Sequence, residues 1–424
     1  MDAGEDAFFV AGLGSPERRA VGKGSYSHLM RVPMPGSQTR RAAAALVALA
    51  ATMSFLSGCT ATPDPDTSPP PGGALIIPDA PTGEFDDDVR TALATTLDAT
   101  VAEYAVPGAV VGVWVPGQGS WVFAAGSADL STGTAADPTM QWPLRSVTKS
   151  FTVTLILQLV DEGRVRLDDT IDEYVDGITN GDRITLRELA NMTSGNADYT
   201  NDAFVAEFSA DPTRLFTLEE LNGFVLGQPA QFDPGARHVY TNANTNLLGA
   251  VVEKVTGESF GDVLEERILG PLELTDTRYI LDAADWEQPH PVGYVIDDGD
   301  PLVQPDNLSI FGPAGSMVST IDDMRVWGTA LATGALLSPE TQAERLDGAP
   351  LEVGPPYDLY ALGIGETDGW WGHNGEGLGF TAAVFHDPAT AATIAVFMNE
   401  SNVEPKAHPA DQLFRRIAAI LSAS

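Results

Sequence analysis

Cysteine and lysine are scarce in this chain of 424 residues. Cys59 is the single cysteine, which excludes a disulfide within the chain. The lysines are Lys23, Lys149, Lys254 and Lys406. Basic residues as a class are few: 23 Lys and Arg stand against 59 Asp and Glu, for a formal net charge of −36. We therefore expect no nucleic acid partner, because binding nucleic acid requires a basic surface that displaces phosphate counterions.

The surroundings of Cys59 have the pattern of an export signal. Arg40 and Arg41 precede the apolar run "AAAALVALAATMSF", and "LSGC" (56–59) follows. This order indicates an export signal and not a spanning helix, and its ending resembles a bacterial lipobox, whose cysteine becomes lipidated. The alternative is an ordinary secretory signal with an incidental cysteine. We predict a signal peptide and lipobox over 34–59, lipidation of Cys59, and an exported lipoprotein anchored on the outer face of the bacterial membrane.

The rest of the chain divides into three parts. Residues before Met30 fit no signal pattern, and we expect 1–33 to be disordered or to precede the true start. Residues 60–83 begin "TATPDPDTSPPPGG" and are predicted to be an extended linker. The pattern from 84 to 424 is globular, without a second linker or an internal repeat, and predicts one catalytic domain.

Strands are predicted at both ends of this domain, and helices between them. The predicted elements are a helix at 87–104, a hairpin of strands 108–115 and 120–127, helices and loops over 147–274, strands beginning near 359, 369, 379 and 392, and a helix from 410. This arrangement predicts an α/β fold of the α+β type. One antiparallel sheet would be flanked by helices and would carry an inserted, mostly helical region.

The first chemical motif is Ser146-Val147-Thr148-Lys149. The helix that it opens is apolar on too broad a face for a surface helix, and Gly163 is a suitable stop. Residues three apart share a helix face, so the lysine amine would lie beside the serine hydroxyl. Burial lowers a lysine pKa, which lets the amine act as a general base. The alternative is a serine N-cap followed by a lysine that reaches water.

Two further motifs follow along the chain. In "YTNAN", Tyr240 and Asn242 precede a helix, where a phenol could relay a proton and an amide could orient a substrate carbonyl. In "GHNGEG" (372–377), glycines allow close backbone approach, and an edge strand could bind an extended substrate. The alternatives are a plain capped helix start and a β-turn with a structural histidine.

The order of the motifs resembles that of the penicillin-recognising serine hydrolases. S-x-x-K comes first, Y-x-N begins 94 residues after Ser146, and H-x-G begins 133 residues after Tyr240. The resemblance covers residues 84–424 and includes stretches such as "LVDEGRVRLDDTIDEYVDG". It is strongest to the branch of class C β-lactamases, D-alanyl-D-alanine carboxypeptidases and related esterases.

The resemblance implies a role for each motif residue. Ser146 would be the acylated nucleophile, Lys149 its base partner, and Tyr240 the proton shuttle to the leaving group. Substrate binding would fall to Asn242, which would hold the substrate amide, and to the strand with His373, whose imidazole would support the tyrosine electrostatically.

Gly375 completes the third motif of that strand. The oxyanion hole would consist of the backbone N–H groups of Ser146 and Glu376. No metal and no organic cofactor is implied by the resemblance.

We therefore expect a serine hydrolase that cleaves an ester or amide through an acyl-enzyme, like a D-alanyl-D-alanine carboxypeptidase or an esterase. The alternatives are a penicillin-binding or sensing module without turnover and a weak class C-type β-lactamase. The expected partner is a small-molecule or peptide ester or amide, such as one derived from the cell wall, and the expected state is a monomer.

The chain departs from the carboxypeptidase pattern near the third motif. Relatives that hold a free C-terminal carboxylate tend to carry Ser or Thr where this chain has Asn374. They also tend to have an arginine on the preceding strand, where "GIGETDG" provides Glu366 and Asp368 instead. We expect these acids to repel a carboxylate, which favours a neutral ester, an amide or an amidated peptide.

Overall fold

The computed structural model describes residues 75, 77–297, 299–401 and 408–423. The predicted export signal, the lipidation of Cys59 and most of the predicted linker lie outside these residues. Among the described helices, none combines the length and the apolar character needed to cross a membrane.

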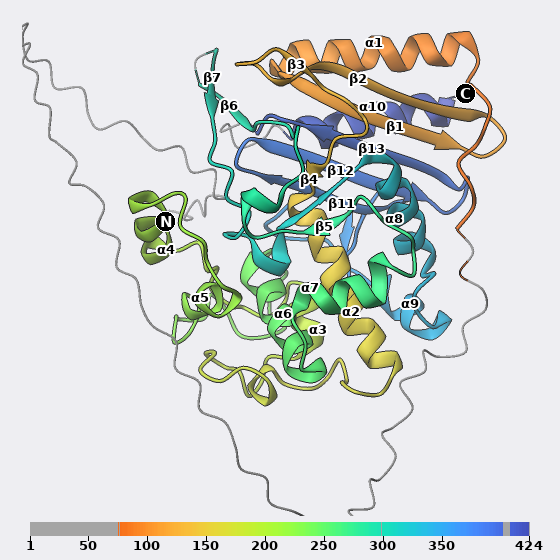
Figure 1. Cartoon of the computed structure of the whole chain (residues 1–424). Coiled ribbons are helices and arrows are strands. Elements are labelled where there is room, and N and C mark those ends of the chain that lie inside the picture. Colours follow the sequence, from red (N-terminus) through yellow and green to blue (C-terminus); the bar gives the residue numbers. More distant parts are fainter. Residues whose placement is uncertain (1–74, 76, 298, 402–407, 424) are drawn as a thin grey trace, which may run out of the picture. The chain divides into compact units, whose positions relative to one another are not determined.

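An antiparallel sheet of eight strands organises the fold (Figure 1). The strand order is β3-β2-β1-β13-β12-β11-β10-β9. Strand β1, near the start of the domain, therefore pairs with β13, near its end, and Ala109 lies opposite Met398. The strands of this sheet are β1 (Gly108–Val115), β2 (Gly119–Asp129), β3 (Thr134–Ala135), β9 (Leu359–Tyr360), β10 (Gly365–Thr367), β11 (Trp370–Gly377), β12 (Phe380–Asp387) and β13 (Ala392–Met398).

Helices cover both faces of the sheet. On one face, α1 and α10 pack together over the sheet, whereas α8 packs on the other face, between the sheet and the remaining helices (Figure 1). The helices are α1 (Asp87–Tyr104), α2 (Thr148–Asp161), α3 (Leu186–Ala190), α4 (Asp202–Ala210), α5 (Leu218–Gly223), α6 (Asn242–Thr256), α7 (Phe260–Leu264), α8 (Ile321–Thr333), α9 (Pro339–Arg345) and α10 (Pro409–Ala423). The predicted α+β architecture, with its inserted helical region, is confirmed.

Short elements complete the described chain. A small sheet has the order β4-β8-β5, and β6 pairs with β7 in a hairpin. These elements are β4 (Trp142–Pro143), β5 (Arg278–Tyr279), β6 (Tyr294–Asp297), β7 (Asp300–Val303) and β8 (Met317–Ser319), the 3-10 helices η1 (Arg145–Val147), η2 (Ile171–Glu173), η4 (Ala283–Asp285) and η5 (Gly312–Ala314), and the π-helix η3 (Glu265–Leu269).

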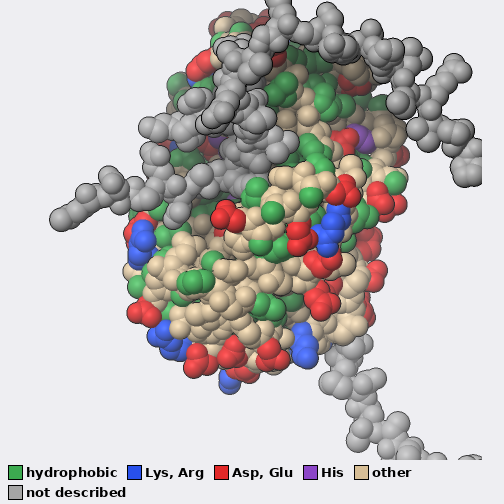
Figure 2. Space-filling view, turned by 90° about the vertical axis from the view of Figure 1, so that its left-hand side faces the viewer, with side chains coloured by type: hydrophobic (Ala, Val, Ile, Leu, Met, Phe, Trp, Pro, Cys, Tyr) green, Lys and Arg blue, Asp and Glu red, His purple; other side chains and the backbone are tan. Residues whose placement is uncertain are grey.

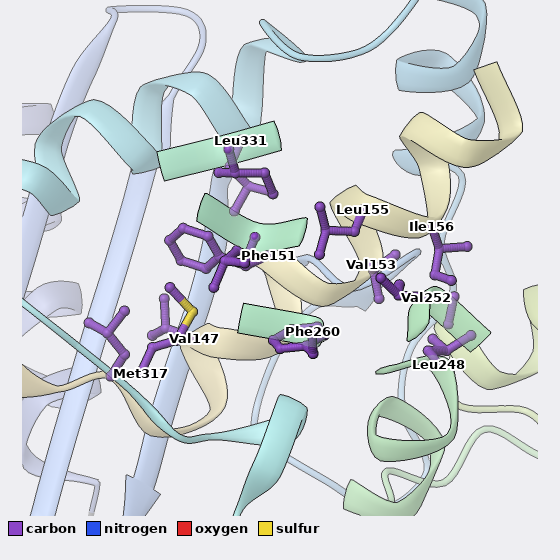
Figure 3. Packing of buried hydrophobic residues seen from close by; sticks show 14 of the residues in the cluster. Val147, Phe151, Val153, Leu155, Ile156, Leu248, Val252, Phe260, Met317 and Leu331 are labelled. Carbon is purple, nitrogen blue, oxygen red and sulfur yellow. The ribbon is translucent and has the colours of Figure 1, made fainter. Parts of the chain in front are cut away.

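Helix α2 lies in the core, as its apolar sequence predicts. Residues 148–157 are all buried, and the helix packs against α6 and α7. Figure 3 shows Ile156 of α2 beside Leu248 and Val252, and Phe151 in the same packed cluster. The helix ends where Gly163 adopts the left-handed conformation. This burial positions the N-terminus of α2 rigidly at the sheet.

The boundaries of several predicted elements are close to those observed. The predicted helix at 87–104 coincides with α1, whereas strand β2 extends two residues beyond the predicted hairpin and the β6–β7 hairpin was not predicted. The outer surface mixes charges: Figure 2 shows acidic and basic side chains intermixed around the lower part of one face, with hydrophobic side chains scattered between them.

Candidate active site

Ser146 and Lys149 are in direct contact. Ser146 lies in η1, which runs directly into α2, so that Lys149 stands one turn further along the same face. The lysine Nζ is 3.0 Å from the serine Oγ. The lysine side chain is fully buried, and the serine makes no capping hydrogen bond at the start of α2. The alternative of a capping serine and a solvent-reaching lysine therefore does not describe this structure.

Three oxygens surround the Lys149 amine. Its Nζ also donates to Asn242 Oδ1 at 2.8 Å and to the Ala314 carbonyl at 2.9 Å. An ammonium can donate to all three oxygens, whereas a neutral amine can keep its two hydrogens on Asn242 and Ala314 and leave its lone pair for the Ser146 hydroxyl. Burial lowers the pKa of Lys149 to about 7, against an opposing contribution from the Asp198 carboxylate. The amine can therefore act as a base near neutral pH.

Tyr240 stands beside this pair. The lysine Nζ lies 5.2 Å from the centre of the tyrosine ring, and the buried phenol oxygen makes no hydrogen bond of standard geometry, although it is near enough to Ser146 for that hydroxyl to lower its pKa. Burial raises the pKa of Tyr240 well above its usual range, Tyr360 and Tyr357 add to the rise, and Ser146 opposes it. The phenol therefore stays protonated. A protonated phenol can relay a proton, but it cannot act as the phenolate base that deprotonates Ser146.

Asn242 is held by an aspartate that the sequence analysis did not single out. Asp198 Oδ2 accepts the backbone N–H of Asn242 at 2.9 Å and its side-chain amide at 3.2 Å. The carboxylate thus caps α6 from outside, because the side chain of Thr241 at the N-cap makes no capping bond. One amide hydrogen of Asn242 remains available to a substrate carbonyl.

His373 is locked by two tyrosines that also escaped prediction. Its Nδ1 lies 3.1 Å from the Tyr357 hydroxyl and contacts the Asn374 carbonyl, and its Nε2 lies 3.2 Å from the Tyr360 hydroxyl. The carbonyl only accepts, which assigns the proton to Nδ1 and makes Tyr360 the donor to Nε2. Burial lowers the pKa of His373 to about 3, so the ring is neutral. The neutral ring brings no net charge to Tyr240, whose ring centre lies 6.3 Å away, and the expected electrostatic support stays a prediction.

Gly375 allows strand β11 to touch the start of the catalytic helix. A Cβ at this position would stand 2.3 Å from the Leu144 carbonyl oxygen and 2.7 Å from the Ser146 nitrogen. A side chain cannot be accommodated there without moving η1 or the strand. The third motif is thus in contact with the first.

The edge of β11 beyond Gly372 has no strand partner on the β10 side, because the β10 pairing ends there. Asn374 uses its N–H on this edge to donate to the Tyr357 hydroxyl at 2.9 Å. Alternate residues of a strand direct their backbone groups to the same side, so Glu376 also directs its N–H and C=O to this free edge. The role of this N–H as an oxyanion donor stays a prediction.

The side chain of Asn374 and the acids of "GIGETDG" lie apart from the nucleophile. Asn374 accepts from the Tyr357 hydroxyl and donates to Asp411 of α10, so it offers a substrate carboxylate nothing. Glu366 pairs with Trp371, four residues before Gly375 or roughly 13 Å along the strand, and accepts the N–H of Gly369 in the hairpin turn. The expected repulsion of a carboxylate by these acids therefore has a weak geometric basis.

The comparisons with known proteins agree with this geometry. A family model described as Beta-lactamase matches residues 93–419. The D-aminopeptidase of Brucella canis is 30% identical over 333 residues, which cover 74% of this chain and 61% of that protein. The D-aminopeptidase of Brucella anthropi is 32% identical over 242 residues, which cover 56% of this chain and 45% of that protein. The chain thus spans about half to three fifths of the length of these relatives.

Two solved structures have a similar fold. The D-stereospecific amidohydrolase from a Streptomyces species is 29% identical, with a TM-score of 0.67 over 77% of this chain and 97% of that one. The D-amino acid amidase from Ochrobactrum anthropi SV3 is 24% identical, with a TM-score of 0.70 over 80% of this chain and 99% of that one. The second likeness concerns the fold alone.

Proposed function

Because the chain belongs to the beta-lactamase family of serine hydrolases, we propose that it hydrolyses the amide bond of small D-amino acid amides or short D-peptides through an acyl-enzyme on Ser146. The observation that carries the proposal is the contact of the fully buried Lys149 amine with Ser146 Oγ at 3.0 Å. The amide and the D-configuration are supported by similarity to proteins named D-aminopeptidase and D-stereospecific amidohydrolase.

Acylation starts at the serine. Ser146 Oγ attacks the substrate carbonyl carbon while its proton passes to the neutral Lys149 amine. The carbonyl oxygen takes up the negative charge and accepts hydrogen bonds from the backbone N–H groups of Ser146 and Glu376. Tyr240 then delivers a proton to the leaving nitrogen and is reprotonated from Lys149, and the C–N bond breaks. This step releases ammonia or an amine and leaves an ester on Ser146.

Deacylation repeats the sequence with water. Lys149 takes a proton from the attacking water, the tetrahedral carbon forms again in the same N–H cradle, and the ester bond to Ser146 Oγ breaks. Ser146 recovers its proton and the free acid leaves. If deacylation were slow, the acyl-enzyme would accumulate, and the protein would act as the penicillin-binding or sensing module that is the alternative from the sequence.

The carboxylate of Asp198 favours an acyl group with a free amine. It lies beside Asn242, the residue proposed to hold the substrate amide, and it acts electrostatically on Lys149. A positive α-ammonium on the substrate is therefore favoured at this end of the site, whereas a second carboxylate is not. The expected preference against a free C-terminal carboxylate concerns the leaving group and is a separate prediction from this preference at the acyl group.

A substrate panel with purified protein tests the function. The panel contains D- and L-phenylalanine amide, D-Ala-D-Ala peptides with free and amidated ends, p-nitrophenyl butyrate and nitrocefin. We expect the highest kcat/KM with the D-amide and none with the Ser146→Ala variant. A clear preference for the free-ended peptide, the ester or nitrocefin would instead assign the carboxypeptidase, esterase or β-lactamase activity. Stoichiometric acylation without turnover would assign the sensor.

We further propose that the chain is exported and lipidated at Cys59. The support is the order of basic, apolar and small residues that ends at the single cysteine. Full-length protein expressed in a bacterial host should partition into the detergent phase, and Cys59→Ser should move it to the aqueous phase. Equal partitioning of the two proteins would contradict lipidation.

A further inference from the structure

Arg145, the residue before the nucleophile, has an unfavourable backbone conformation. Its φ is 50°, in the left-handed region that residues with long side chains rarely adopt. Such a conformation persists only where surrounding contacts impose it. The side chain is 3% exposed, so a guanidinium group is buried next to the serine. Burial of this kind requires specific partners for the charge.

The Arg145 side chain contacts the β11–β12 hairpin and the segment that contains Asp306 and Phe311. Its Nε donates to the Gly377 carbonyl at 2.8 Å. The guanidinium carbon lies 4.5 Å from the centre of the Phe311 ring and 5.2 Å from that of Phe380. Phe380 faces Gly377 across the hairpin, so one side chain contacts both strands at their connection. Asp306 is near enough to act on the cation electrostatically.

These contacts join the two halves of the oxyanion hole. Arg145 is bonded to Ser146, whose N–H is one donor, and Gly377 is bonded to Glu376, whose N–H is the other. The hydrogen bond from the Arg145 side chain to Gly377 therefore ties the residue before one donor to the residue after the other, and the buried aromatic contacts of the guanidinium restrict how far that tie can move. We propose that Arg145 is a positioning residue that holds the N–H groups of Ser146 and Glu376 at the spacing needed to stabilise the oxyanion. This inference rests on the proposed acyl-enzyme reaction.

The chemistry of the arginine suits this task. A planar guanidinium can donate in a fixed direction while its faces lie against aromatic rings, and a lysine cannot do both. The residue contacts no reacting atom, so its effect is expected on the stabilisation of the transition state and not on substrate affinity. Arg145→Lys is therefore not a conservative substitution at this position.

A second buried arginine provides the matched control. Arg345 is 1% exposed and contacts the Ser150 carbonyl and Thr154 of α2, away from β11. Burial lowers the pKa of both arginines to about 9, so each substitution removes a buried guanidinium. Replacing Arg345 should disturb the core without moving either oxyanion donor.

The experiment compares wild type, Arg145→Ala, Arg145→Lys and Arg345→Lys, all as the full chain, with p-nitrophenyl acetate that carries a ¹³C-labelled carbonyl as the substrate. Turnover gives kcat and KM, and infrared difference spectra give the stretching band of the acyl-enzyme carbonyl. We expect both Arg145 variants to lose about 10²–10³-fold in kcat, as when one oxyanion donor is lost, with KM little changed. Their carbonyl band should move to higher wavenumber, and guanidinium below denaturing concentrations should partly restore Arg145→Ala, whereas sodium chloride should not.

Other results overturn the inference. An unchanged kcat, an unchanged carbonyl band, or a band shift of the same size in Arg345→Lys would each show that Arg145 does not position the oxyanion hole. Failure of both Arg145 variants to fold would make the arginine a structural residue only. If wild type neither forms an acyl-enzyme with this ester nor hydrolyses D-phenylalanine amide, the proposed function fails instead, so the two failures are distinguishable.

Discussion

Phe151 and Trp327 lie face to face, with ring centres 3.6 Å apart and planes inclined by 12°. Phe151 belongs to α2 and Trp327 to α8, the helix that packs on the sheet. The indole nitrogen of Trp327 also donates to Ser150 Oγ at 3.0 Å. The helix that begins at the candidate nucleophile is thereby fixed to the sheet within two turns of Ser146.

Removal of this contact should reduce stability more than activity. Phe151 is fully buried, and Phe151→Ala is expected to lower the free energy of unfolding by about 3–5 kcal/mol, through lost burial and the cavity that remains. Phe123→Ala is the control, because Phe123 is 44% exposed and should lose less than about 1.5 kcal/mol. Chemical denaturation measures both, and equal losses would contradict the assigned role of the α2–α8 contact.

Activity should rise with pH as Lys149 loses its proton. Below a pH of about 7 the amine is protonated and has no lone pair for Ser146, whereas above it the neutral base predominates. We expect kcat/KM to increase between pH 5 and 8 with an apparent pKa near 7. Lys149→Ala should lower kcat/KM by about 10²–10⁴-fold at pH 8. A flat pH profile in wild type would argue against the lysine as the base.

Asp198→Asn should shift that profile to lower pH. The carboxylate raises the pKa of Lys149, so removal of its charge lets the amine deprotonate at a lower pH. Asparagine keeps an oxygen that can accept the Asn242 N–H, which limits structural damage. Asp202→Asn is the control, because Asp202 is exposed in the first turn of α4. This variant should leave the apparent pKa of the rise in kcat/KM unchanged. The test is the same measurement of kcat/KM against pH. An apparent pKa that stays the same or increases in Asp198→Asn would contradict the electrostatic effect of Asp198 on Lys149.

Gly375→Ala should impair catalysis out of proportion to its size. The new Cβ would meet the Leu144 carbonyl and the Ser146 nitrogen, which forces β11 away from one oxyanion donor. We expect kcat to fall by at least about 10²-fold. Gly223→Ala is the matched control, because no atom lies within 4 Å of its Cβ position and its φ is not positive. The control should keep full activity, and a Gly375→Ala enzyme as active as this control would refute close contact of the two motifs.

Local patterns predicted the parts of the site that depend on one element. The i, i+3 spacing of Ser146 and Lys149 and the apolar face of the following helix were sufficient to place the two side chains together and in the core. Likewise, alternating and continuous apolar runs predicted β11 to β13, whose pairing follows from their order in the chain. These features need only helix and strand geometry.

Residues that reach the site from loops had no such signal. Asp198 acts on Asn242 from 44 positions away, and Tyr357 reaches His373 only because β10 and β11 pair. An acid in a turn-rich stretch and a tyrosine after two prolines each fit many ordinary surface roles, so composition could not single them out. Arg145 adjoins the nucleophile, but its proposed positioning role depends on a hydrogen bond to a carbonyl 232 positions later. Such roles depend on tertiary contacts, which the local sequence does not show.

The free edge of β11 also limits what can be docked along it. Tyr357 accepts the Asn374 N–H, and the His373 ring contacts the Asn374 carbonyl, so both edge groups of that residue are already occupied. An incoming extended chain therefore finds the backbone of Glu376 and then meets the Tyr357 side chain. We therefore expect backbone pairing along this edge to hold one residue of a substrate, which would favour short molecules over long polymers.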